Sequence, residues 1–203
     1  MPGPETSERI VAVNRRVAFQ GHFRIAEYRF RHSLFGGGAS GEIKREVFER
    51  GHAAAVLPYD PARDHVVLIR QFRAGAHAAG RHAWVWETVA GIIEDGETGA
   101  DVARREAREE ADLEIGELVA MCDFLVSPGG TSETCAMFCG RVDASAAGGV
   151  HGLASEGEDI LVRAFDLAEA RAMLERGEIA SATGVIGLQW LLLHRDELRA
   201  RWR

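Results

Sequence analysis

The sequence predicts an α+β fold in which a mixed sheet is flanked by helices. Strand-like apolar runs come first, one acidic helical segment is inserted among them, and two amphipathic helical segments come last. This order does not follow the regular strand-helix alternation of a parallel sheet. The 203 residues suffice for one well-buried domain, or for one domain with a small extra layer. We place the boundary near residue 50, with a strand-rich N-terminal region at 1–50 and the main domain at 51–203.

The first elements read as strands. Residues 9–35 mix apolar and polar side chains as strands do, and the run GGGASG at 36–41 predicts a turn. The runs AAAVLPYD and VVLIRQFR, joined by DPARD, predict a hairpin of the central sheet at 53–73. AWVWETVAG at 83–91 predicts one further strand that ends in glycine.

The next element is a helix at 99–111. Its small apolar residues recur at three- and four-residue spacing, which predicts a face lying close against the sheet: Ala100, Ala103, Ala107 and Ala111. A strand, a loop and a strand follow over 118–142, and the Gly-rich segment 144–159 predicts a long mobile loop of the kind that carries function. Residues 160–166 predict the strand that closes the sheet, before two helices at 166–179 and 183–202.

Composition excludes several classes of function. The formal net charge of -7 argues against a nucleic-acid partner, whose phosphates require a basic surface. Cys122, Cys135 and Cys139 form no CxxC pair, which indicates reduced thiols rather than disulfides or a zinc site. Cys135 and Cys139 are expected to be buried in a strand. The N-terminus lacks the apolar core of a signal peptide and no segment has eighteen uninterrupted apolar residues, so we expect a cytoplasmic protein without membrane contact.

The helix at 99–111 concentrates negative charge. Glu106, Glu109 and Glu110 lie within one turn, where like charges repel by about 0.2–0.5 kcal/mol per pair. A solvated face, with neighbouring arginines as counterions, is the simpler explanation. The alternative is a divalent cation such as Mg²⁺, which prefers several carboxylate oxygens around it. Arg105 stands where its side chain reaches either Glu97 or a phosphate.

The spacing around this helix resembles a known motif. Residues 91–113 read G-x5-E-x7-R-E-A-R-E-E-A-D-L, similar to the Nudix box G-x5-E-x7-R-E-U-x-E-E-x-G-U, where U is a bulky aliphatic residue. Six fixed positions match: Gly91, Glu97, Arg105, Glu106, Glu109 and Glu110. Two positions depart from the motif, because Ala107 is small and Asp112 replaces the glycine that ends the helix. Since aspartate tolerates the left-handed conformation, we expect a slightly strained helix end with the chemistry retained.

Further segments, at 49–61, 126–133 and 154–159, resemble the bacterial ADP-ribose pyrophosphatases within this superfamily. The resemblance implies a Nudix-type α/β/α sandwich that binds Mg²⁺, with Mn²⁺ as the alternative ion. It implies metal ligands at Glu106, Glu109, Glu110, Glu158 and the carbonyl of Ala90. Glu156 matches the general base, and Arg105 and Glu109 take part in the catalytic motif.

The same resemblance implies the groups that hold the substrate. Arg73 matches an arginine that pairs with the phosphates, and Arg45 one that contacts the substrate from the N-terminal region. The aromatic residue that stacks on the base falls at Phe23 or its neighbour His22. In the loop SPGGTSE, whose Pro and Gly residues would specify a turn in any case, Ser127, Gly129 and Glu133 are the candidate substrate contacts.

The implied reaction is hydrolysis of ADP-ribose to AMP and ribose 5-phosphate by a homodimer that swaps its N-terminal strands. Two alternatives remain open at this point. The first is a Nudix enzyme for another nucleotide sugar such as GDP-mannose, because the metal chemistry would be the same. The second is an ADP-ribose sensor without hydrolytic activity. The intact set of glutamates argues against a sensor, and Asp112 is the feature that favours it.

Overall fold

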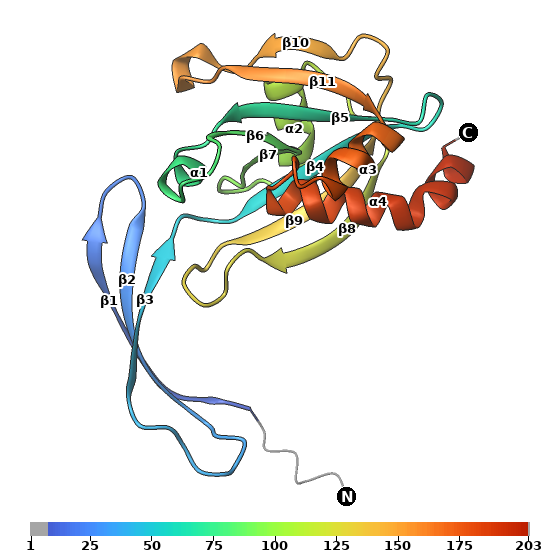
Figure 1. Ribbon diagram of the computed structural model, residues 1–203. Coiled ribbons are helices and arrows are strands. Elements are labelled where there is room, and N and C mark those ends of the chain that lie inside the picture. The colour runs from blue at the N-terminus through green and yellow to red at the C-terminus, as the bar shows by residue number, and fades with distance from the viewer. Residues whose placement is uncertain (1–7, 203) are drawn as a thin grey trace, which may run out of the picture. The chain divides into compact units, whose positions relative to one another are not determined.

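The computed structural model describes residues 8–202, and the chain divides by its contacts into two units (Figure 1). The first unit contains the chain up to Gly51 together with Leu125–Glu133. The second contains His52–Phe124 and the chain from Thr134 onward. The loop at 125–133, expected in the main domain, therefore belongs by its contacts to the N-terminal unit.

The first unit is a three-stranded antiparallel sheet in the order β1-β2-β3, built from β1 (Ile10–Gln20), β2 (Arg24–His32) and β3 (Ile43–Glu49). The loop joins this sheet through backbone hydrogen bonds at Phe48, whose N–H donates to the carbonyl of Gly130 at 2.8 Å. In return, the N–H of Ser132 donates to the carbonyl of Phe48 at 3.2 Å. These bonds explain why a segment distant in sequence belongs to this unit.

The second unit is built on an eight-stranded mixed sheet with the main order β10-β11-β5-β4-β9-β8. Its strands are β4 (Ala53–Asp60), β5 (His65–Phe72), β6 (Trp84–Glu87), β7 (Val89–Ile92), β8 (Leu118–Leu125), β9 (Thr134–Arg141), β10 (Gly148–His151) and β11 (Ile160–Asp166). The pair β4–β9 is parallel, whereas β5 is antiparallel to β11. The expected mixed sheet is confirmed.

The hairpin β4–β5 opens shortly after its turn. The two strands pair only at Tyr59–Val66 and Asp60–His65. Beyond that point β7 pairs with β4 and β6 pairs with β5, so that the chain at 84–92 fills the gap. This split places the end of β7, with Ala90 and Gly91, inside the sheet beneath a helix.

Helices cover both faces of this sheet (Figure 1). They are α1 (Ala74–Ala78), α2 (Gly99–Ala111), α3 (Leu167–Glu175) and α4 (Ala182–Arg201). On one face, α2 packs its alanines against a core that includes Val67 and Ile69. On the other, α3 and α4 enclose Leu68, Phe165 and Trp202. None of the helices in residues 8–202 has the length and hydropathy needed to cross a bilayer.

Three expectations about elements were wrong in part. The single strand expected at 83–91 is two strands, because Thr88 separates the part paired with β5 from the part paired with β4. The long loop expected at 144–159 contains β10 and a 3₁₀ turn at Ala154–Glu156. Consequently β11 does not close the sheet but lies between β10 and β5. The short helix α1 was not expected.

Candidate active site

The helix α2 holds the acidic residues, and both of its ends are fixed by local chemistry. At the N-terminus, the Thr98 hydroxyl accepts from the N–H of Asp101 at 3.2 Å, and the Asp101 carboxylate accepts from the N–H of Thr98 at 2.9 Å. At the C-terminus, Asp112 adopts the left-handed conformation, with φ 50° and ψ 42°. The expected cap conformation at Asp112 is confirmed, and the helix still spans 99–111 as predicted.

Gly91 lets the helix approach the sheet. A Cβ atom at Gly91 would lie 1.7 Å from Oε1 of Glu106, so the carboxylate of Glu106 lies directly over the glycine backbone. No side chain fits in this space unless Glu106 moves. The absence of a side chain at Gly91 therefore leaves the space in which the carboxylate of Glu106 is held.

Arg105 holds three carboxylates together. Its guanidinium donates to Glu97 at 2.9 and 3.0 Å, to Glu106 at 2.7 Å and to Glu109 at 3.2 Å. These partners, with Glu97 first, raise the pKa of Arg105. The repulsion between Glu106 and Glu109 is thus offset by a shared cation from their own helix. The expected contact between Arg105 and Glu97 is present.

Glu110 is the most enclosed acid of the helix, with 3% of its surface exposed. Its carboxylate accepts from the N–H of Ala90 at 3.1 Å and from the amide of Gln71 at 3.4 Å. Burial raises the pKa of Glu110 to about 8, and the charges of Glu106 and Glu158 act in the same direction. Burial also raises the pKa of Glu106, although the charge of Arg105 opposes this.

The chain after β10 brings a further acid to the same place. Glu158 accepts from the N–H of Leu153 at 2.9 Å, which closes the turn at 153–158. Its charge acts on both Glu106 and Glu110, so the three carboxylates are electrostatic neighbours. Glu156 lies two residues earlier, exposed in the 3₁₀ turn. Arg73 follows β5, forms an ion pair with Glu87 at 2.7 Å and lowers the pKa of Glu110 by its charge.

This set of donors fits a hard divalent cation. Glu106, Glu110 and Glu158 supply carboxylate oxygens, and the two acids on the helix have raised pKa values because burial disfavours their charged forms. A bound cation would favour those charged forms. Among residues 8–202, no group of three or more acidic, His or Cys side chains has the arrangement of a formed metal site. Arg105 donates hydrogen bonds to oxygens of Glu106 and Glu109.

The remaining expected substrate residues lie in the first unit. Phe23 packs edge-to-face on Phe48, with ring centroids 5.3 Å apart, and the guanidinium of Arg50 lies 5.3 Å from the Phe23 ring. Arg50 also reaches Glu133 at 3.6 Å. The structure thus gathers Phe23 and Glu133 around Arg50. The expected loop residues Ser127 and Gly129 lie in the same unit, and Arg45 projects from β3 with an exposed side chain.

The sequence did not predict a role in the site for two residues, Gln71 and Arg50. Gln71 reaches Glu110 because its side chain points to the α2 side of β5. In the sequence it is simply the second of two polar residues that follow the apolar run VVLI. Arg50 links Phe23 to Glu133, and only the fold brings these three residues together. The sole sequence signal for Gln71 was a polar side chain at a position where the alternation of the strand predicts a buried residue.

The chain is similar to several known proteins. The model of the NUDIX domain matches residues 49–183. A protein of Escherichia coli named ADP-ribose pyrophosphatase is 50% identical over 190 residues, which cover 94% of this chain and 91% of the relative. A protein of the same name from Haemophilus influenzae is 39% identical over 96% of this chain and 91% of its own length.

Two further similarities are more distant. A GDP-mannose pyrophosphatase of Citrobacter koseri is 38% identical over 153 residues, covering 73% of this chain and 77% of the relative. A solved structure described as an ADP compounds hydrolase superposes with a TM-score of 0.69 at 20% identity, covering 96% of this chain and 95% of the other. The latter confirms the expected fold class.

Proposed function

The chain belongs to the NUDIX domain family, and we propose on this basis that it hydrolyses the pyrophosphate of ADP-ribose to AMP and ribose 5-phosphate. The observation that carries the proposal is the cluster of Glu106, Glu110 and Glu158 over the backbone of Ala90 and Gly91. The identity of one half to a protein named ADP-ribose pyrophosphatase, over almost the whole chain, supports the choice of substrate.

Glu106, Glu109, Glu110, Glu158 and the carbonyl of Ala90 would hold Mg²⁺, with Mn²⁺ as the alternative ion. When bound, such an ion supplies charge neutralisation for the pyrophosphate and lowers the pKa of a bound water. The burial of Glu110 and its hydrogen bond from Ala90 fix the position of its carboxylate, and Gly91 does the same for Glu106.

The other residues of the site bind the substrate and move the proton. Arg73 pairs with the phosphate oxygens, for which it exchanges its present partner Glu87. Glu156 accepts the proton of the attacking water, and its exposed turn lets it approach that water within about 2.6–3.2 Å. Arg105 orients Glu106 and Glu109 through its hydrogen bonds.

The N-terminal unit contributes the adenosine contacts and a dimer interface. Phe23 would stack on the base, Arg45, Ser127, Gly129 and Glu133 would contact the remainder of the substrate, and Arg50 holds Phe23 and Glu133 in place. Apolar side chains of β1 are exposed, with 58% of Val13 and 63% of Phe19 accessible. A second copy of the chain that swaps its N-terminal strands would cover them. No disulfide joins Cys122, Cys135 and Cys139, all of which lie in the described part of the chain, and this supports a reducing, cytoplasmic location.

The deciding test is release of AMP from ADP-ribose by the purified protein, with and without Mg²⁺, beside GDP-mannose. Metal-dependent turnover that favours ADP-ribose is the expected result. Faster turnover of GDP-mannose would assign the chain to the activity named for its more distant relative. Binding of ADP-ribose without hydrolysis would indicate a sensor.

A second prediction concerns Glu110. The change Glu110→Gln keeps the shape of a side chain with 3% exposure but removes its negative charge, so we expect turnover to fall by 100-fold or more while the thermal midpoint changes little. The matched control is Glu114→Gln, which alters an exposed ion pair with Arg108 just beyond the same helix. Equal turnover in the two variants would show that the charge of Glu110 is not needed for the reaction.

A further inference from the structure

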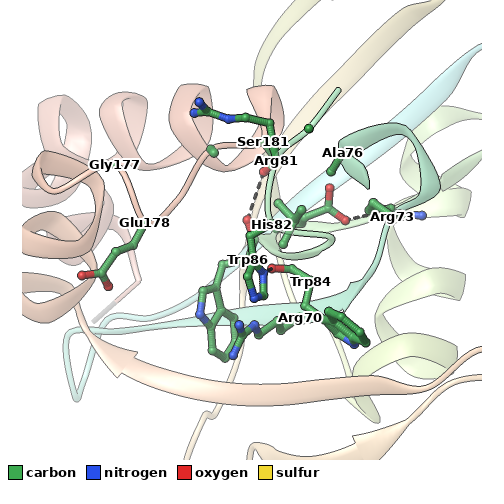
Figure 2. Close-up of a pocket in the computed structure, with 14 residues that line it drawn as sticks. Arg70, Arg73, Ala76, Arg81, His82, Trp84, Trp86, Gly177, Glu178 and Ser181 are labelled. Atoms are coloured by element: carbon green, nitrogen blue, oxygen red, sulfur yellow. Dashed lines mark hydrogen bonds and ion pairs between the residues drawn. The ribbon is translucent and has the colours of Figure 1, made fainter. Parts of the chain in front are cut away.

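A pocket of about 910 Å³ opens on the side of the second unit where β6 meets the connection between α3 and α4 (Figure 2). Its walls come from the end of β5, the chain at 76–82, the strand β6 and residues 177–181. Pockets that hold small molecules have volumes of roughly 300–1,000 Å³. The pocket therefore has room for a ligand of ordinary metabolite size.

This pocket and the carboxylate cluster lie on opposite faces of the sheet. Neighbouring side chains of a strand point to opposite faces. On β5, Gln71 points to α2 and reaches Glu110, whereas Arg70 points the other way and lies over the ring of Trp86 at 5.7 Å. Trp86 itself packs against the core under α3 and α4. The pocket is thus separate from the proposed metal ligands, and Arg73 is the one proposed substrate residue that also lines it.

The pocket has more positive charge than its own acids neutralise. Of the two glutamates in its wall, Glu87 pairs with Arg73 at 2.7 Å and Glu178 pairs with Arg176 at 2.6 Å. Arg70 and Arg81 have no carboxylate partner within residues 8–202. The Nε of Arg70 is buried and also lacks a hydrogen-bond partner in that part of the chain. Such a balance favours an anionic ligand.

One end of the pocket suits a phosphate. Arg81 and Ser181 both line the pocket and are drawn toward the upper end of the view in Figure 2. Ser181 is the N-cap of the 20-residue helix α4, and its hydroxyl accepts from the N–H of Gly184 at 3.2 Å. The positive end of the helix dipole therefore adds to the charge of Arg81, which is exposed and free to turn toward an anion.

The other end of the pocket suits a planar ring. Trp84 and Trp86 project there, on either side of Arg70 in Figure 2. Trp84 has 54% of its surface exposed, which is a large apolar area for a solvent-facing strand residue. His82 is hydrogen-bonded to the carbonyl of Trp84 at 2.9 Å, which steadies this part of the wall. The guanidinium of Arg70 offers donors to ring nitrogen or carbonyl acceptors.

We propose that this pocket is a second ligand site, which binds a nucleoside monophosphate. The phosphate lies at Arg81 and the N-terminal end of α4, where the Ser181 hydroxyl itself donates to the carbonyl of Trp86 at 3.2 Å, and the base stacks on Trp84 beside Arg70. The proposal does not depend on the hydrolytic reaction, because none of Arg70, Arg81 and Trp84 belongs to the proposed active site. Binding is the property to be tested, and it is measured without turnover.

The experiment follows the indole N–H signals of the four tryptophans by NMR while AMP is added to the full chain. Saturable shifts of Trp84 and Trp86, with Trp190 and Trp202 nearly unchanged, are expected. Adenosine and inorganic phosphate, added separately, should bind at least tenfold more weakly, since each provides only half of the contacts. Absence of shifts at millimolar AMP, or equal affinity for adenosine, would overturn the proposal.

Variants identify the binding residues. Arg81→Gln removes an exposed charge and should weaken AMP binding at least tenfold, and the exposed Trp84→Leu should do the same. Arg171→Gln, which removes an exposed arginine of α3 outside the pocket, is the control and should bind like the unaltered chain. All three should retain the hydrolytic rate measured without added AMP. Equal affinity in Arg81→Gln and in the control would contradict the proposed site.

Discussion

Gly91 shows how one small residue determines the position of a charged one. The space that a Cβ atom would occupy is filled by the carboxylate of Glu106, which is also a partner of Arg105. The motif position can thus be explained by packing alone, without reference to backbone conformation. At this scale the sequence was informative, because Glu106, Glu109, Glu110 and Arg105 are brought together by helix geometry. Glu158 is different, because only the fold brings it near them.

The change Gly91→Ala tests this explanation. The added methyl group would lie 1.7 Å from Oε1 of Glu106, so the carboxylate must move by an ångström or more. We expect turnover of ADP-ribose to fall by about 10²-fold, since displacements of this size have effects of that order. Far-ultraviolet circular dichroism should show an intact fold. Turnover at the original rate would mean that the position of Glu106 is not critical.

At the scale of elements, the predictability of each segment follows from the strength of its local signal. The helix α2 was predicted within its observed bounds, because its alanines recur at helical spacing along the whole segment. The five residues of α1 have no such pattern, and their burial shows no apolar face. The break between β6 and β7 at Thr88 depends on two different partner strands, which the run AWVWETVAG does not reveal.

The end of α2 offers a prediction about stability. Asp112 is one of two non-glycine residues with positive φ within residues 8–202, the other being Asp64. We expect Asp112→Gly to increase the free energy of unfolding by about 0.5 kcal/mol, because relief of the left-handed strain slightly exceeds the entropy added to the unfolded chain. Hydrolytic activity should be retained. Denaturant unfolding gives the measurement.

Asp64 provides the matched control. Its carboxylate accepts from the hydroxyl of Tyr59 at 2.7 Å and from Arg195 at 2.6 Å, so glycine there relieves the same strain but removes these bonds. We therefore expect Asp64→Gly to decrease the free energy of unfolding. A loss of stability in both variants would show that the side chain of Asp112 has a stabilising role that its exposed position does not reveal.

For the whole molecule, the two units rely on different interactions. The second unit buries three apolar clusters around its sheet. The first is built on a three-stranded sheet, in which Glu27, with 2% of its side chain exposed, pairs with Arg16, Arg29 and Lys44. Hydrogen bonds from Lys44 and then Arg16 lower the pKa of Glu27 to about 2. Arg15 and then Tyr28 lower the pKa of Glu49 to about 2 as well.

These two carboxylates predict how the N-terminal unit responds to acid. Their pKa values in the folded state lie below that of an unfolded glutamate, about 4.3, so their stabilising effect is complete above about pH 5 and is lost as the pH falls toward 2. We expect amides of β2 to lose protection from hydrogen exchange between pH 5 and 2.5, before amides of β5. Simultaneous loss in both strands, measured by mass spectrometry, would contradict this.

The strand β5 supplies one side chain to the proposed active site and the next side chain back along the chain to the proposed second ligand site. Gln71 faces an acid on one side of the sheet, and Arg70 faces an indole on the other, in a register that pairs Arg70 with both Trp86 and Leu161. An insertion of one residue before Arg70 would present its guanidinium to Glu110, and a deletion there would present the amide of Gln71 to Trp86, while most apolar side chains would still find an apolar neighbour. Changes in chain length should therefore be tolerated in the turn at 144–147 and eliminated in β5, even where they leave a folded protein.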